Sequence, residues 1–277
     1  VLIFSGLILN ELITWQKVKE LDIYAIVVLC ISISITLFLL IFMSLRWKLL
    51  VQMQTNQTFS VKMAYRIYLM AMFFNIFMPG AIGGDMARIK YSSDHCRLSM
   101  KKAGLVVGIE RLFGLTALFI LFAIGAILNF KMLPILEINS YLWGIPVIFV
   151  VIIFAKYWIS KHIKIRFSMY LPILSLSAIG QLTDIIIVYL FCRYFSLNVS
   201  FGNLLIIMPL VYIATVLPIS IGGLGVREGA MVGLFSLFSV DVSIVVIISF
   251  MMYLSKVGVG LVGLPFFLKF KGSRISD

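Results

Sequence analysis

Charged side chains are scarce in this chain of 277 residues, at 12% of the total, and only 11 of them are acidic. Soluble globular domains contain about 25% charged residues. A hydrophobic content of 62% accompanies the shortage. The composition therefore excludes an ordinary soluble domain and indicates an integral membrane protein, with no room among these residues for a soluble catalytic domain.

Residues that bind metals or form disulfides are also few. Cys30, Cys96 and Cys192 are too scattered for a disulfide framework or a zinc site, and His95 and His162 have no ligand spacing. The sequence also lacks a phosphate-binding Gly-x-x-x-x-Gly-Lys-Ser/Thr loop, a His-Glu-x-x-His motif and a nucleophile elbow. We therefore predict no metal, no cofactor, no catalytic residue and no nucleic-acid partner, and the sequence argues against ATP-driven pumping by this chain alone.

Apolar stretches of about 20 residues, long enough to cross a ~30 Å hydrocarbon layer, recur along the chain. They predict full spans at 22–45, 103–128, 141–160, 171–192 and 243–268, and a partial span at 1–13. Segments 63–91 and 202–240 are also apolar, but proline and paired glycines interrupt each of them. The sequence therefore predicts an all-α, polytopic transmembrane helical bundle that forms a single domain over residues 1–277.

Basic residues separate between the predicted loops. Lysine and arginine in short loops mark the cytoplasmic side of a membrane protein, and most of the 23 in this chain lie on the flanks of segment 63–91, between 156 and 166, and after 268. The first of these groups begins with Arg46, directly after the predicted end of span 22–45. We therefore predict a cytoplasmic C-terminus in the cytoplasmic (inner) membrane of a prokaryote, and the net charge of +12 reports topology.

The two interrupted segments share the pattern Pro-x-x-Ile-Gly-Gly-x-x-x-Arg. It begins at Pro79 and again at Pro218, and we call the sequence separation of these two prolines the repeat offset. Each copy lies between two full spans, which defines pseudo-repeats at 22–128 and 171–268, and the linking span 141–160 reverses the orientation of the second. The sequence therefore predicts an inverted repeat of two broken, re-entrant hairpins whose tips meet near the middle of the bilayer, the best sequence pointer to a transporter binding site.

The chemistry of each hairpin tip suits an anionic lipid headgroup. Proline ends the first half-helix, paired glycines permit a tight reversal and close backbone approach, and the next half-helix begins with free N–H groups and a positive dipole end. Arginine's planar fork adds a match to phosphodiesters. The predicted headgroup-binding residues are Asn75, Gly83, Gly84 and Arg88 in the first hairpin and Ser220, Gly222, Gly223 and Arg227 in the second. The alternative is that glycine and proline only kink packed helices.

Ionisable residues inside apolar spans are costly and indicate function. We interpret six of them as entrance or coupling residues: Asp85, Glu110, Arg111, Asp184, Glu228 and Lys256. Glu110 and Arg111 face the cytoplasmic entrance in this interpretation. Asp184 and Lys256 lie at depths that favour a structural salt bridge, and the alternative makes Asp184 a protonatable coupling site. The remaining two carboxylates either cap the second half-helices or pair with the hairpin arginines.

Three motifs together resemble the membrane domain of the lysylphosphatidylglycerol synthase family, also called the flippase-like or UPF0104 type. They are Asn75-x-Phe-x-Pro79-Gly80-x-x-Gly83-Gly84-Asp85-x-x-Arg88, Glu110-Arg111-Leu112, and Leu217-Pro218-x-Ser220-x-Gly222-Gly223-Leu224-Gly225-Val226-Arg227-Glu228. The resemblance covers residues from about 20 to 268. In bifunctional members this domain moves an aminoacylated phospholipid between leaflets, and a cytosolic domain, absent from these residues, attaches the amino acid. The resemblance therefore implies lipid handling without aminoacyl transfer.

The function predicted from the sequence is that of a lipid flippase, not an enzyme, which moves an anionic phospholipid or a polyprenyl-phosphate-linked precursor between leaflets. Its predicted partners are membrane lipids. One alternative is a non-transporting accessory that presents lipid to a separate synthase or glycosyltransferase. Another is an intramembrane transferase acting on a lipid-linked substrate with Asp85 or Glu228 as base. The sequence does not define the oligomeric state.

Overall fold

The computed structural model describes residues 21–55, 57–77, 82–129, 157, 165–216 and 225–272. This part of the chain contains helices and no strand, which confirms the all-α prediction. The α-helices are α3 (Ile23–Gln52), α4 (Val61–Phe77), α5 (Ile82–Cys96), α6 (Met100–Leu128), α8 (Tyr170–Tyr194), α9 (Phe201–Val216), α10 (Val226–Phe235) and α11 (Val242–Gly272). Two short 3-10 helices, η4 (Phe167–Met169) and η6 (Ser236–Phe238), complete the elements.

Four helices in the described part are long and apolar enough to cross a membrane. They contain Ile23–Gln52, Met100–Leu128, Phe167–Tyr194 and Val242–Leu268, and they correspond to four of the predicted spans. The predicted span 141–160 and the apolar start 1–13 lie outside the described residues, apart from Tyr157. The chain is therefore an integral membrane protein built on these four helices.

The first long helix differs from its prediction. Placing Arg46 in a cytoplasmic loop was wrong, because α3 continues beyond residue 45 to Gln52 and Arg46 is buried inside the bundle. The helix begins where the Asp22 carboxylate accepts the N–H groups of Tyr24 and Ala25, at 3.0 and 3.2 Å. A charge can lie within an apolar helix when its partners are buried with it, and Arg46 has such partners.

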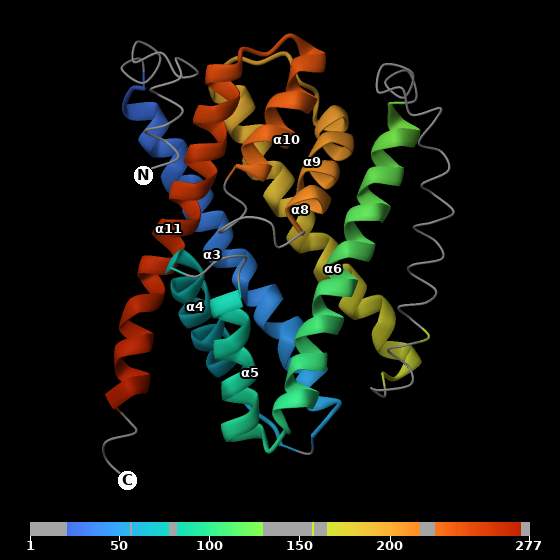
Figure 1. Ribbon diagram of the computed structural model, residues 1–277, viewed down its shortest axis with the longest axis vertical. Helices are drawn as coiled ribbons and strands as arrows, with labels where there is room; N and C mark the ends of the chain where they lie inside the picture. The colour runs from blue at the N-terminus through green and yellow to red at the C-terminus, as the bar shows by residue number, and fades with distance from the viewer. Residues whose placement is uncertain are drawn as a thin grey trace.

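The two interrupted segments each form a pair of short helices. Helices α4, α5, α9 and α10 contain 17, 15, 16 and 10 residues, and at about 1.5 Å of rise per residue each is too short to cross a ~30 Å layer. In Figure 1, α4 and α5 lie in the lower half of the view and α9 and α10 in the upper half, whereas α3, α6, α8 and α11 run along the long axis. The two hairpins therefore lie toward opposite ends of the bundle.

The packing of the helices follows the predicted repeat. The exchange replaces α3, α4, α5 and α6 by α8, α9, α10 and α11 in that order, and the reverse. Under it, the α3–α8 contact maps onto itself, and every other substantial contact between α-helices maps onto another such contact. For example, α4 packs against α11, and α9 packs against α6. Each hairpin therefore rests on the last long helix of the other half, so the halves are interlocked. The boundaries 22–128 and 171–268 stay predictions.

Glycines permit the closest of these exchanged contacts. A Cβ atom on Gly125 of α6 would lie 2.8 Å from the carbonyl carbon of Leu205 in α9. On the other side of the exchange, a Cβ atom on Gly263 of α11 would lie 2.7 Å from the carbonyl carbon of Leu69 in α4. Small residues that let helix backbones approach are a common basis of association within membranes. In both long helices, a glycine therefore allows close packing against the hairpin of the other half.

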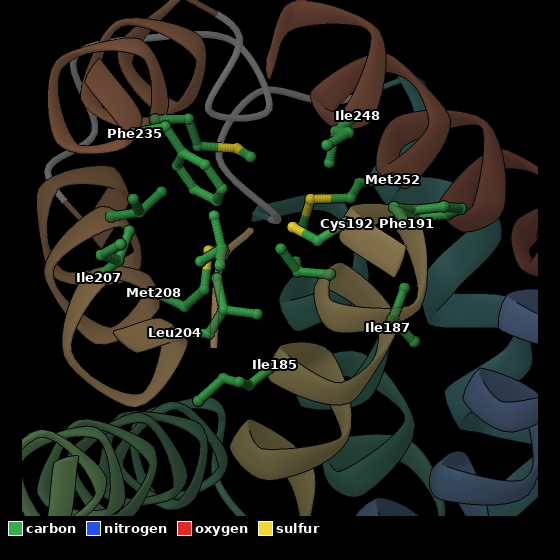
Figure 2. Packing of buried hydrophobic residues seen from close by; sticks show 14 of the residues in the cluster. Ile185, Ile187, Phe191, Cys192, Leu204, Ile207, Met208, Phe235, Ile248 and Met252 are labelled. Atoms are coloured by element: carbon green, nitrogen blue, oxygen red, sulfur yellow. The ribbon is translucent and has the colours of Figure 1, made fainter. Parts of the chain in front are cut away.

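Two apolar clusters correspond largely to the two halves. Figure 2 shows the cluster formed mainly by α8, α9, α10 and α11, where Phe235, Met208, Phe191 and Met252 pack together. The other cluster lies mainly among α3, α4, α5 and α6 and contains Trp47. The charged residues considered next lie on helices that these two clusters hold in place.

Candidate functional site

Glu110 is the centre of a buried ionic network in the first half of the chain. It lies on α6 and is 2% exposed. Its carboxylate accepts hydrogen bonds from Arg46 of α3, with Nη2 at 2.8 Å and Nε at 3.2 Å, and further bonds from Tyr68 of α4 and Arg88 of α5. One carboxylate therefore joins four helices.

Arg88 extends the network toward Asp85. Its Nη1 donates to the Tyr68 hydroxyl at 2.6 Å and to Glu110, and its Nη2 pairs with Asp85 at 2.5 Å. The guanidinium carbon also lies 4.7 Å from the centre of the Tyr68 ring, within range of a cation–π interaction. Asp85 in turn accepts from Arg111 of α6, with Nε at 2.8 Å. Arg88 therefore contacts three protein acceptors, those of Tyr68, Glu110 and Asp85, in this conformation.

The network carries more positive than negative charge. Arg46, Arg88 and Arg111 share two carboxylates, those of Asp85 and Glu110. The first two arginines are buried, whereas the Arg111 side chain is 50% exposed. The accessible member of this positively charged network is therefore the Arg111 guanidinium, which an anion can approach without displacing Glu110.

A smaller network occupies the equivalent place in the second half. Arg227 of α10 pairs with Glu228 at 2.8 Å, and its Nε donates to the hydroxyl of Ser249 on α11 at 2.9 Å. The Ser249 hydroxyl donates to Glu228 at 2.7 Å. Glu228 also accepts the N–H of Gly225, the residue before α10, whose φ of 89° favours glycine. Both charges of this network are therefore buried and satisfied.

The two networks are related by the sequence repeat. Arg88 contacts Glu110, and adding the repeat offset to these two positions gives Arg227 and Ser249, which also contact each other. The offset read from the hairpin motif therefore also relates the partners of the arginines on the long helices. The chemistry differs, because a carboxylate in the first half corresponds to a hydroxyl in the second.

The glycines of the first hairpin lie inside a helix. Gly83 and Gly84 belong to the first turn of α5, so the prediction that they form the tight reversal was wrong for this pair. Gly84 serves close approach instead: its N–H donates to the Asn75 side-chain oxygen at 2.8 Å, and a Cβ there would lie 2.6 Å from the Ala71 carbonyl oxygen. Asn75 therefore caps α5. In the second hairpin, the predicted headgroup-binding residues Ser220, Gly222 and Gly223 lie outside the described residues.

Asp184 and Lys256 lie near the middle of α8 and α11, respectively, and interact electrostatically. No ion pair within 4.0 Å joins them among the residues that the structure describes. The predicted salt bridge is therefore a longer-range interaction in this conformation.

Four members of these networks were not singled out from the sequence. Arg46 was assigned to a loop, and Tyr68, Ser177 and Ser249 carry no charge that would mark them in an apolar span. Arg46 Nη1 donates to the Ser177 hydroxyl at 2.8 Å, which connects the first network to α8. A signal was available for Ser249, because the repeat offset relates it to Glu110.

The fold and these networks define a class: a polytopic helical membrane protein with two short-helix hairpins, each holding a buried arginine. The comparisons with known proteins give the family. The family described as "Lysylphosphatidylglycerol synthase TM region" matches residues 3–263, and the chain belongs to that family. No curated protein and no solved structure matches the chain. The family indicates a membrane protein involved in lipid handling.

Proposed function

We propose that this protein moves an anionic phospholipid or a lipid-linked precursor from one leaflet of the membrane to the other. The observation that carries the proposal is the exchange-related pair of hairpins, each built of helices too short to span the membrane and each with a buried arginine network. Buried charges within spans mark substrate pathways. Two such networks toward opposite ends of one bundle suit a headgroup that is received at one face and released at the other.

The roles of the residues follow from their surroundings. The half-exposed Arg111 beside Asp85 receives the headgroup phosphate at the entrance. Arg88 and Arg227 bind it along the path, where a phosphate oxygen takes the place of a carboxylate oxygen in the guanidinium fork. In this proposal the α4–α5 hairpin and the C-terminus lie on the cytoplasmic side of a prokaryotic inner membrane.

The decisive experiment measures leaflet exchange in proteoliposomes. Fluorescent phosphatidylglycerol in the inner leaflet is protected from dithionite until it crosses the bilayer, and fluorescent diacylglycerol reports the same movement without a phosphate. We expect the chain to accelerate exchange of phosphatidylglycerol and Arg111→Gln to slow it, because Arg111 is accessible and its loss leaves Glu110 paired with Arg46 and Arg88. Arg193→Gln, at an exposed arginine near the end of α8, is the matched control.

The double variant Arg88→Ala/Arg227→Ala tests the path itself, with thermal unfolding to show that it folds. Unchanged exchange in both this variant and Arg111→Gln would remove the proposed mechanism. Lipid binding without any leaflet exchange by the wild type would favour an accessory that presents lipid to a separate synthase or glycosyltransferase. Formation of a modified lipid by the isolated chain would favour a transferase.

A further inference from the structure

Lys256 is an exposed cation near the middle of the span Val242–Leu268. Its neighbour Ser255 is buried and accepts a hydrogen bond from Ser32 of α3 at 2.9 Å. Lys256 interacts electrostatically with Asp184 of α8 and Arg227 of α10, and both of these helices pack against α11. An ammonium that meets only lipid at this depth is costly. The arrangement therefore favours a polar surrounding that a headgroup can reach.

The cations on the membrane helices differ in their partners. Arg46, Arg88, Arg111 and Arg227 each have a carboxylate within 4.0 Å. Within the described part of the chain, Lys256 forms no such pair and donates no hydrogen bond. A phosphate that binds the buried Arg46, Arg88 or Arg227 competes with a carboxylate already in contact with the guanidinium, whereas one that binds Lys256 meets no direct competitor. Lys256 is therefore the most available of these cations.

A second unsatisfied group lies nearby. The Tyr212 hydroxyl of α9 is buried without a hydrogen-bond partner in the described structure. It interacts electrostatically with Asp184 and Arg227, the two residues that also interact with Lys256. A buried hydroxyl without a partner is unfavourable, and a ligand oxygen would satisfy it. An ammonium on α11, a carboxylate on α8, a guanidinium on α10 and an unsatisfied hydroxyl on α9 thus lie on four helices that pack against one another in a closed ring.

We propose that Lys256 is the phosphate ligand of a mid-membrane lipid subsite, in which Tyr212 donates to a phosphate oxygen and Asp184 is the counter-ion that the phosphate replaces. The inference deepens the proposed function, on which it rests for the identity of the ligand as a lipid. Arg227, which is paired with Glu228 and Ser249 in the ligand-free structure, adds a further positive charge. The subsite belongs to the second half alone, because the repeat offset relates Tyr212 and Lys256 to Phe73 and Ala117 in the first half.

The test measures binding, separately from transport. Dihexanoyl phosphatidylglycerol is titrated into the detergent-solubilised full chain by microscale thermophoresis, with inorganic phosphate and dihexanoylglycerol as further probes. We expect Lys256→Gln to weaken phosphatidylglycerol binding about ten- to a hundredfold, and Lys256→Arg to retain most of it. Lys101→Gln, at an exposed lysine in the first turn of α6, is the matched control and leaves binding unchanged.

The competing counter-ion gives a change of the opposite sign. Asp184→Asn removes a negative charge near the phosphate and is expected to tighten binding about three- to tenfold, since like charges in a poorly screened site repel. If Asp184 and Lys256 served only to stabilise the fold, both variants should bind phosphatidylglycerol more weakly. Wild-type affinity in Lys256→Gln, weaker binding in Asp184→Asn, or equal binding of dihexanoylglycerol would each overturn the proposal. If inorganic phosphate binds and its binding depends on Lys256, this supports Lys256 as the phosphate ligand and shows that the acyl chains are dispensable for binding.

Accessibility provides an independent measurement. In a Cys30→Ser background, which removes the exposed native cysteine, Lys256→Cys in the reconstituted chain is expected to react with a charged, membrane-impermeant thiosulfonate. Phosphatidylglycerol should slow that reaction, and no reaction would contradict a headgroup-accessible subsite. If the protein binds lipid through Lys256 but does not accelerate leaflet exchange, only the proposed function is overturned. If it accelerates leaflet exchange but its lipid binding does not depend on Lys256, only the subsite is overturned.

Discussion

Replacing Glu110 by glutamine tests whether the first network is held together by charge. Glutamine has nearly the same size and keeps one acceptor oxygen, so the change removes little packing. It does remove the counter-charge of Arg46 and Arg88, both of which are buried. Removal of one partner from a buried ion pair costs about 3–5 kcal/mol, because the remaining charge is left uncompensated.

The equivalent position in the second half supplies the comparison. Ser249→Ala removes a hydroxyl that accepts from Arg227 and donates to Glu228, but these two residues keep their 2.8 Å ion pair. The expected cost is that of two ordinary hydrogen bonds, about 2 kcal/mol. Glu110→Gln should therefore be about twice as destabilising as Ser249→Ala, although the two residues are related by the repeat.

Thermal unfolding in detergent, followed by circular dichroism, measures the difference. Each kcal/mol lowers Tm by about 2–4 °C in a protein of this size, so the expected loss is roughly 6–20 °C for Glu110→Gln and about 4–8 °C for Ser249→Ala. Lys90→Gln, which removes an exposed ion pair with Asp94, should change Tm by less than about 2 °C. Equal effects of the first two changes would refute the reasoning that Glu110 compensates two buried arginines.

Further predictions concern the glycines that seat the hairpins. Gly84→Val should separate α4 from α5, because its Cβ meets the Ala71 carbonyl oxygen 2.6 Å away. Limited proteolysis should therefore cleave the reconstituted Gly84→Val variant faster than Gly108→Val. Gly108 is the control, because no neighbouring atom lies within 4 Å of a Cβ added there. Gly263→Val should destabilise the α4–α11 contact by more than about 3 kcal/mol, since overpacking against a backbone finds no soft neighbour. A wild-type Tm for Gly263→Val would show that the two backbones separate freely.

Hydrophobicity and the hairpin motif carried most of the fold prediction. Span length follows from the thickness of the hydrocarbon layer, and the repeated Pro-x-x-Ile-Gly-Gly-x-x-x-Arg pattern led to two broken segments that the structure shows as pairs of short helices. The end of α3 was missed because Arg46 was treated as a loop charge, although its counter-charge lies far along the chain on α6. A pairing between distant helices leaves no local pattern.

The candidate site shows the same limit. Asp85, Glu110 and Arg111 stood out as charges in apolar segments, and the structure brings them together with Arg88. Tyr68 and Ser249 were missed because tyrosine and serine are common in membrane helices, and only their contacts give them a role. The glycine pair was assigned to the turn, whereas Gly84 is needed where α5 crosses α4.

The exchange of hairpins between halves has a consequence for biosynthesis. Helix α4 is made early, but the long helix on which it rests, α11, is the last described helix to leave the ribosome. Until then the face of α4 around Leu69 must be shielded by lipid or by an insertion factor. Release of the nascent chain before Gly263 should therefore leave a membrane-inserted but incompletely packed intermediate, and synthesis of the final span should complete both halves at once.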